Sequence, residues 1–262
     1  SQKLKAKSYQ LTIGWLYPDL MSTYGDRGNI IVLQKRAEWR GIKVELKQIF
    51  LDTEYSILNT VDLFFMGGAQ DTQQEIVNRD LQNTKGRTLG SMIEKGVPGL
   101  FICGAYQFLG KYYQTADNKK LPGLGIFPLF TENPGEKYPR LIGNIVVEPK
   151  IEGLTQPLVG FENHGGRTYL DYKNQRLGDV KKGFGNNGKD GNEGIVYKNS
   201  FGTYLHGPIL PKNPQLADLI LTRALEQKYG EPFDSAQGAK FHLEPLDGSL
   251  EQKARQAILS RF

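Results

Sequence analysis

The sequence predicts an α/β fold in which a mainly parallel, twisted sheet is flanked by helices and followed by a C-terminal helical tail. Short apolar runs alternate with segments of helical spacing between residues 11 and 110. Turn-forming residues separate these segments, as at Gly67-Gly68. Strands that alternate with helices form right-handed crossovers and therefore parallel sheets. A chain of 262 residues is long enough to bury a sizeable core under such a sheet.

The first half of the chain contains this alternation in its most regular form. Apolar, β-prone stretches predict strands at residues 11–17, 43–50, 61–66 and 98–102. Helical spacing predicts helices at residues 30–41, 71–82 and 88–94, and a further helix after Cys103. Ligands of parallel sheets bind at the carboxyl ends of the strands, so Gly67-Gly68 and Cys103 are expected on one rim.

The second half is less regular. Residues 115–140 are rich in Pro and Gly and show little periodicity, and residues 183–194 are expected to form a surface loop. Strands are expected at residues 141–147, 158–162, 194–198 and 201–205, and helices at residues 214–229 and 249–262. The last helix presents Leu250, Ala254, Ala257 and Ile258 on one face, which suits either packing within the chain or docking on a partner.

Composition excludes several classes of protein. Charged residues make up 23% of the chain, and the net charge of +5 is dispersed, so no basic stripe for nucleic acid is indicated. One cysteine cannot form an internal disulfide, which favours the cytoplasm. No signal peptide, membrane-spanning segment or metal-ligand spacing is present, so neither membrane insertion nor a metal in this chain is expected.

Cys103 is the first candidate catalytic residue. It stands at a strand-to-helix junction, where helix N-terminal amides favour a thiolate. The N–H of Gly104 and that of Gly68 are expected to form an oxyanion hole for attack on an amide carbonyl. A buried core cysteine is the competing interpretation from position alone.

Histidine is the expected base for such a nucleophile. His206 ends a strand-like run and precedes Gly207-Pro208, which places it at a rim. His164, expected in a loop, is the second candidate. His242 lies in the irregular tail and is expected to be structural or exposed to solvent.

Four blocks carry a resemblance to a known family. They are Ile102 to Gly110, Phe161 to Arg167, Tyr204 to Gly207, and Leu16 to Asn29. In this order they resemble class I glutamine amidotransferases of the cobyric-acid-synthase-like branch. Within that branch they are most similar to the amidotransferase subunits of lipid II isoglutaminyl synthases. The resemblance covers residues 9–230, the expected amidotransferase domain, and leaves residues 231–262 as a tail with a possible docking helix.

The resemblance implies a complete reaction. Cys103 would attack the carboxamide of L-glutamine, and His206 would activate the thiol and protonate the departing ammonia. A Mur-ligase-like synthetase subunit, in a heterodimer with this chain, would use the ammonia to convert the D-glutamate of lipid II to D-isoglutamine. ATP and Mg would bind that subunit, and this chain would hold no cofactor.

Two further residues match substrate positions of the family. Gln107 would contact glutamine, although a helix-surface glutamine is the competing interpretation. Arg140 would engage the substrate, and its guanidinium fork suits a free α-carboxylate. The alternative is an exposed arginine at a strand edge. Asp19 and Asp26 are expected to be turn or N-cap residues.

One position departs from the pattern of many class I enzymes, which place a glutamate two residues after the histidine. Pro208 stands there, so no local carboxylate orients His206. Either a dyad suffices, or Glu162 or another acid of the chain folds nearby, or the partner subunit supplies the acid.

Other functions stay open at this point. The chain could serve another ATP-dependent synthetase, such as one for cobyrinate, but it contains no P-loop pattern of its own. A cysteine γ-glutamyl hydrolase or peptidase on a similar fold is a second alternative. A non-catalytic binding module that keeps the fold is the third.

Overall fold

A six-stranded sheet forms the centre of the computed structural model. The structure describes residues 9–23, 25–69, 71–230 and 243–260, and within them the strand order of this sheet is β13-β14-β4-β3-β1-β2. The strands are β1 (Gln10–Leu16), β2 (Lys43–Ile49), β3 (Leu63–Met66), β4 (Gly99–Ile102), β13 (Ile195–Tyr197) and β14 (Ser200–Thr203). All neighbours are parallel except β13 and β14, which confirms the predicted mainly parallel sheet.

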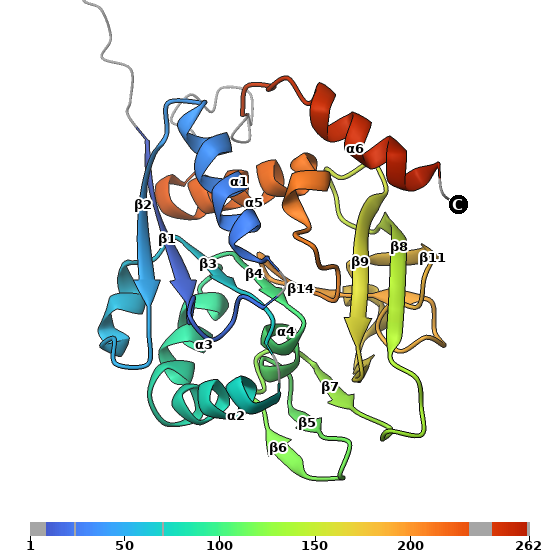
Figure 1. Cartoon of the computed structure of the whole chain (residues 1–262). Helices are drawn as coiled ribbons and strands as arrows, with labels where there is room; N and C mark the ends of the chain where they lie inside the picture. The colour runs from blue at the N-terminus through green and yellow to red at the C-terminus, as the bar shows by residue number, and fades with distance from the viewer. Residues whose placement is uncertain (1–8, 24, 70, 231–242, 261–262) are drawn as a thin grey trace, which may run out of the picture.

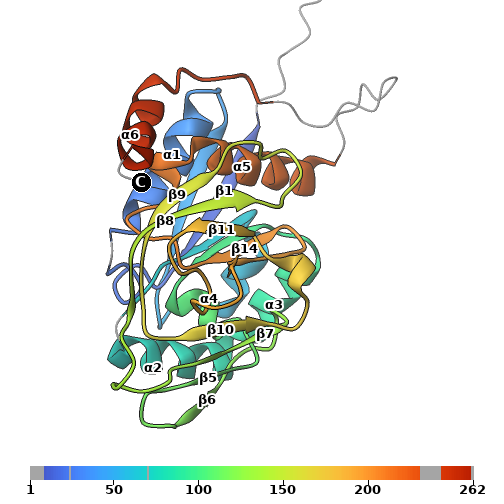
Figure 2. The same ribbon diagram turned by 90° about the vertical axis from the view of Figure 1, so that its right-hand side faces the viewer.

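Helices cover both faces of this sheet (Figures 1 and 2). One layer contains α1 (Arg27–Glu38) and α5 (Pro214–Tyr229), and the other contains α2 (Asp71–Asp80) and α3 (Gly86–Glu94). A π-helical turn, Leu81–Lys85, joins α2 to α3. Because the sheet is buried on both sides, every residue of β3 and β4 is buried, and their sequences are continuous apolar runs.

The remaining strands form two smaller sheets, one below the central sheet in Figure 1 and one at its right-hand side. One has the order β10-β7-β5-β6 and the other β12-β11-β8-β9, and their pairings are antiparallel except β5 with β7. Their strands are β5 (Tyr112–Gln114), β6 (Lys120–Pro122), β7 (Leu129–Glu132), β8 (Leu141–Pro149), β9 (Leu158–His164), β10 (Arg167–Leu170), β11 (Gly178–Lys182) and β12 (Asn192–Glu193). The sequence predicted only β8 and the first part of β9, because strands of two to five residues are too short to show a period.

The expected surface loop at residues 183–194 is correct only in part, because residues 183–184 and 188–191 are exposed but the rest of the segment is buried. Asn186, Asn187 and Glu193 are all buried. The Asn186 carboxamide accepts hydrogen bonds from the Tyr106 hydroxyl (3.2 Å) and the Gly194 amide (2.8 Å). The Asn side chains satisfy buried backbone groups, so residues 185–187 and 192–194 pack inward.

The C-terminal helix α6 (Ser249–Leu259) confirms the predicted element, but the face expected either to pack or to dock is largely exposed, at Leu250, Ala254 and Ala257. Leu250 is 76% exposed, whereas Arg255 is 7% exposed. The guanidinium of Arg255 donates to Gln156 (2.7 Å), and Glu251 lies 3.4 Å from Arg36 of α1. Polar contacts therefore hold this helix on the domain. Most of the irregular segment before it, with His242, lies outside the described residues.

Candidate active site

Cys103 occupies a strained turn between β4 and the short helix α4 (Gly104–Phe108). Its φ of 53° and ψ of −107° lie in a region that residues with a side chain rarely adopt, at a cost of about 1–3 kcal/mol. The Cys103 amide donates to the Thr203 carbonyl of β14 (2.9 Å), which fixes the turn to the neighbouring strand. A nucleophile on a sharp strand-to-helix turn has this geometry, since the turn presents the side chain at the rim of the sheet.

Gly104 packs closely against Gln74. A Cβ on this residue would lie 2.7 Å from the Nε2 of Gln74, which itself donates to the Ala69 carbonyl (2.7 Å). As the first residue of α4, Gly104 has an N–H without a partner inside the helix. The Gly104 N–H is therefore available as one of the two expected oxyanion donors.

Gly68 differs from its expected role as the second oxyanion donor. Its N–H already donates to the Asp26 carboxylate (2.9 Å), so it is not free in this structure. Asp26 is fully buried at the N-cap position of α1, yet it makes no cap hydrogen bond, and burial raises its pKa to about 6. Ala69, one residue further along, lines the cavity beside Cys103.

His206 reaches the same rim from β14. The strand pairs in parallel with β4, with Thr203 opposite Ile102, so both chains leave the sheet side by side. The His206 amide donates to the Phe161 carbonyl (2.7 Å), which ties the segment to β9. Burial, with smaller contributions from His164 and Arg140, lowers the pKa of His206 to about 3. The imidazole is therefore neutral, which is the form that a general base requires, and a nearby thiolate would raise its pKa.

A polar cavity of about 290 Å³ opens beside the thiol. Its walls come from the central rim and from both smaller sheets. The lining residues are Ala69, Gln74, Cys103, Gln107, Tyr113, Asn133, Arg140, Asn163, His164, Gly165 and Gly166. Of the residues predicted from the sequence, the cavity brings together Cys103, Gln107 and Arg140.

Arg140 lies at the mouth of this cavity, just before β8. Its Nε and one terminal nitrogen donate to the Asn163 side chain (2.9 Å) and carbonyl (3.0 Å). The other terminal nitrogen lies 3.3 Å from where a Cβ on Gly165 would be. The guanidinium is thus held in one orientation, as bidentate recognition of a carboxylate requires.

Gln107 is buried, unlike a helix-surface glutamine. Its Nε2 donates to the Tyr204 hydroxyl (3.0 Å), which also bonds to Thr168 (2.6 Å). Thr168 bonds in turn to Thr131 (2.7 Å). This network holds the Gln107 carboxamide against the cavity, and sequence reasoning missed its threonines because nothing in their local pattern distinguishes them.

His164 is the last residue of β9 and not a loop residue. Its Nδ1 bonds to the Gly166 carbonyl (2.8 Å), and its Nε2 lies 3.8 Å from Glu162. Both Glu162 oxygens accept backbone amides, from Phe184 (2.7 Å) and Gly185 (2.9 Å). Burial lowers the pKa of His164, which also favours its neutral form.

A second buried carboxyl, Glu193, lies beneath the rim. It accepts the Thr203 hydroxyl (2.7 Å) and the Tyr204 amide (2.8 Å), just upstream of His206. Burial raises its pKa to about 8. Sequence reasoning missed this residue, because it stands in the segment expected to be a surface loop.

A cysteine on a strained turn beside a polar cavity, at the carboxyl edge of a parallel sheet, defines a thiol-dependent enzyme of the amidotransferase class. The chain belongs to the family of CobB/CobQ-like glutamine amidotransferase domains, whose model matches residues 12–214. The described residues contain no group of three or more His, Cys, Asp or Glu side chains arranged to hold a metal ion. None of the helices described is long and apolar enough to cross a bilayer.

The sequences of several known proteins are similar to this chain, and their names are consistent with this family. The chain is 45% identical to the lipid II isoglutaminyl synthase (glutamine-hydrolyzing) subunit GatD of Staphylococcus aureus, over 97% of this chain and 96% of the relative. It is 42% identical to the subunit of the same name from Streptococcus pneumoniae, over 85% and 84% of the two chains. A cobyric acid synthase of Pelotomaculum thermopropionicum is 28% identical over 57% of this chain and 30% of that protein.

Proposed function

We propose that this chain is the glutamine-hydrolysing subunit of a lipid II isoglutaminyl synthase. The observation that carries the proposal is the strained Cys103 turn, which opens into a polar cavity with Arg140 at its mouth. The two GatD relatives support the particular substrate, since the names of both contain lipid II and glutamine hydrolysis. The cytoplasm, where a free thiol stays reduced, is the proposed location.

The proposed reaction begins with the thiol of Cys103. The imidazole of His206 takes the thiol proton, and the sulfur attacks the side-chain carbonyl carbon of glutamine. Arg140 holds the α-carboxylate of glutamine, and Gln107 contacts the substrate from the cavity wall. The Gly104 amide stabilises the oxyanion, while the Gly68 amide can join only if its bond to Asp26 opens.

Collapse of this intermediate breaks the carbon–nitrogen bond, and His206 protonates the departing ammonia. Water then hydrolyses the γ-glutamyl thioester to glutamate and restores the thiol. The ammonia passes to a Mur-ligase-like partner, which binds ATP and Mg and activates the α-carboxyl of D-glutamate in lipid II. Ammonia displaces the activating group and gives D-isoglutamine.

We propose that the partner also supplies the acid that orients His206. Pro208 stands where many class I enzymes carry a glutamate, and the carboxylate of Glu162 already accepts two backbone amides. An acid that arrives with the partner would keep glutamine hydrolysis slow until the two subunits meet. Equal glutaminase turnover by the lone chain and by the complex would contradict this arrangement.

The decisive experiment uses the complex of this chain with a Mur-ligase-like subunit. Glutamine labelled with ¹⁵N in its side chain should label the isoglutamine of lipid II in an ATP-dependent manner. With Cys103→Ala the complex should lose glutamine-dependent amidation but keep amidation from added ammonium chloride, because only the ammonia supply is removed. Glutamine-dependent amidation by the Cys103→Ala complex would refute the assigned nucleophile.

A further inference from the structure

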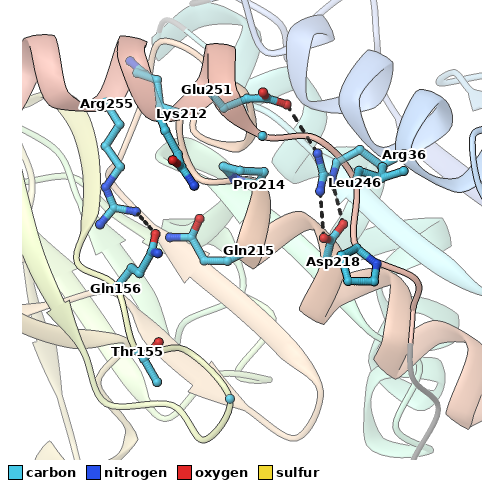
Figure 3. Close-up of a pocket in the computed structure, with 14 residues that line it drawn as sticks. Arg36, Thr155, Gln156, Lys212, Pro214, Gln215, Asp218, Leu246, Glu251 and Arg255 are labelled. Carbon is cyan, nitrogen blue, oxygen red and sulfur yellow. Dashed lines mark hydrogen bonds and ion pairs between the residues drawn. The ribbon is translucent and has the colours of Figure 1, made fainter.

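A second cavity lies where the C-terminal helix α6 meets the domain (Figure 3). It measures about 260 Å³, which is far more than one water requires. Its walls come from α1, the turn after β8, the start of α5, residues 245–248 and α6, and it shares no lining residue with the active-site cavity.

Opposite charges neutralise one end of this cavity. Arg36 donates two hydrogen bonds to the Asp218 carboxylate (2.6 and 2.7 Å) and lies 3.4 Å from Glu251. Arg40 adds a further contact to Asp218 (2.9 Å). The two carboxylates at this end are thus matched by two guanidinium groups.

Positive charge is unmatched at the other end. Among the described residues, no carboxylate lies within ion-pair distance of Lys212 or Arg255. Arg255 is 7% exposed and donates to the neutral side chain of Gln156 (2.7 Å). Burial alone lowers the pKa of both basic groups, so each charge is partly desolvated without compensation.

Gln215 adds a third donor at this end. Its Nε2 is buried and has no hydrogen-bond partner within the described part of the chain. Figure 3 shows Lys212, Arg255 and Gln215 gathered at one end of the cavity, with Arg36, Asp218 and Glu251 at the other. An unpaired buried donor costs about 1–3 kcal/mol, which an acceptor in the cavity would recover.

The start of α5 faces the same space, since Pro214 and Gln215 line it. No side chain caps this 16-residue helix, because the carboxamide of Asn213 bonds instead to the Val159 amide (2.9 Å) and carbonyl (2.7 Å). The positive end of the helix dipole therefore adds to the two basic side chains.

We propose that this cavity binds a phosphoryl anion, held by Lys212, Arg255 and Gln215. The donors come from three different elements, which suits a tetrahedral group with oxygens in several directions. The guanidinium fork of Arg255 pairs with phosphate oxygens, and the ammonium of Lys212 acts as a compact point charge. The volume admits a diphosphate or a phosphate ester as well as free phosphate.

The proposed site lies close to the catalytic segment. A Cβ on Gly207, the residue after His206, would stand 3.6 Å from the Nζ of Lys212. Bound phosphate would therefore sit between the C-terminal helix and the chain that carries the catalytic histidine. The inference does not depend on the proposed function, since it concerns residues outside the active-site cavity.

The test measures binding of inorganic phosphate and of pyrophosphate to the purified full chain by calorimetry at constant ionic strength. Lys212→Gln with Arg255→Gln should weaken binding roughly tenfold or more, because two charge-assisted contacts are lost. The matched control removes two charges elsewhere, by Lys181→Gln with Lys182→Gln on the exposed part of β11, and should leave binding within about twofold.

The single variant Lys212→Gln separates loss of binding from a folding defect. The Lys212 side chain forms no described ion pair, so its replacement should leave the Tm unchanged. It should still weaken phosphate binding severalfold. Vesicles containing phosphatidylglycerol distinguish the source of the phosphate: a lipid headgroup would carry the protein to the vesicles, and a soluble phosphate would not. No binding by the unmodified chain, or equal binding by the chain and the Lys212 variants, overturns the proposal.

Discussion

The imidazole of His164 lies flat against the phenol ring of Tyr204, with the ring centroids 3.6 Å apart and the planes 5° apart. The two residues come from the ends of β9 and β14, which belong to different sheets. Because the Tyr204 hydroxyl also holds Gln107, this stack joins the wall of the cavity to the helix that follows the nucleophile.

Tyr204→Phe tests that connection. The stack should persist, but Gln107 and Thr168 each lose a buried hydrogen-bond partner, so unfolding free energy should fall by about 1–3 kcal/mol. The KM for glutamine should rise more than kcat falls, because Gln107 is no longer held. Steady-state kinetics and thermal unfolding measure both effects. Tyr169→Phe, on a ring that stacks with Phe130 outside the cavity, should change neither.

Arg140→Lys should weaken glutamine binding while leaving the chemical step nearly intact. Lysine keeps the charge but cannot make both contacts to Asn163 or present a fork to a carboxylate. We expect KM to rise roughly tenfold with kcat changed by less than about threefold. Arg176→Lys, at a residue paired with Asp179 away from the cavity, is the matched control. An unchanged KM would remove Arg140 from the substrate site.

Cys103→Gly and Cys103→Ala should both abolish glutaminase activity, but they should differ in stability. Alanine keeps a side chain at φ 53°, whereas glycine adopts this conformation without strain. The strain relieved is about 1–3 kcal/mol, whereas the conformational entropy that a glycine loses on folding costs about 0.5–1 kcal/mol. The glycine variant should therefore be the more stable. Chemical denaturation of the two variants gives the comparison. A less stable glycine variant would show that the turn is unstrained.

Asp26→Asn should change the pH dependence of stability. Burial raises the folded-state pKa of Asp26 to about 6, above its usual 3.8. The folded state therefore holds the proton more tightly, so this group stabilises the fold below pH 4 and loses that contribution as the pH rises through 6. Two pKa units correspond to about 3 kcal/mol.

Asparagine keeps an oxygen for the Gly68 amide and has no charge to desolvate. The difference in unfolding free energy between the variant and the unmodified chain should therefore grow in favour of the variant from pH 4 to pH 7. Denaturation series at several pH values measure it. Asp19→Asn, at an exposed position in the same loop, should show no such trend.

Sequence alone predicted the central sheet because its strands are defined by local pattern. β3 and β4 are buried on both faces, so each is a continuous apolar run that needs no knowledge of its neighbours. The position of Cys103 after such a run followed directly, since a parallel strand presents its carboxyl end to ligands. The blocks around Cys103 and His206 likewise identified the family before any contact was known.

Tertiary structure alone decided the rest of the cavity. The strands of the two smaller sheets are short, and long-range pairing forms them, so residues such as Tyr113 and Asn133 carried no signal. The same applies to Gly68, whose amide is bound by Asp26 from 42 residues away. It also applies to α6, where Arg255 is buried and Leu250 exposed because polar partners on other elements outweigh the apolar face. Local periodicity specifies which elements form, whereas hydrogen bonds and burial between distant segments decide what each side chain meets.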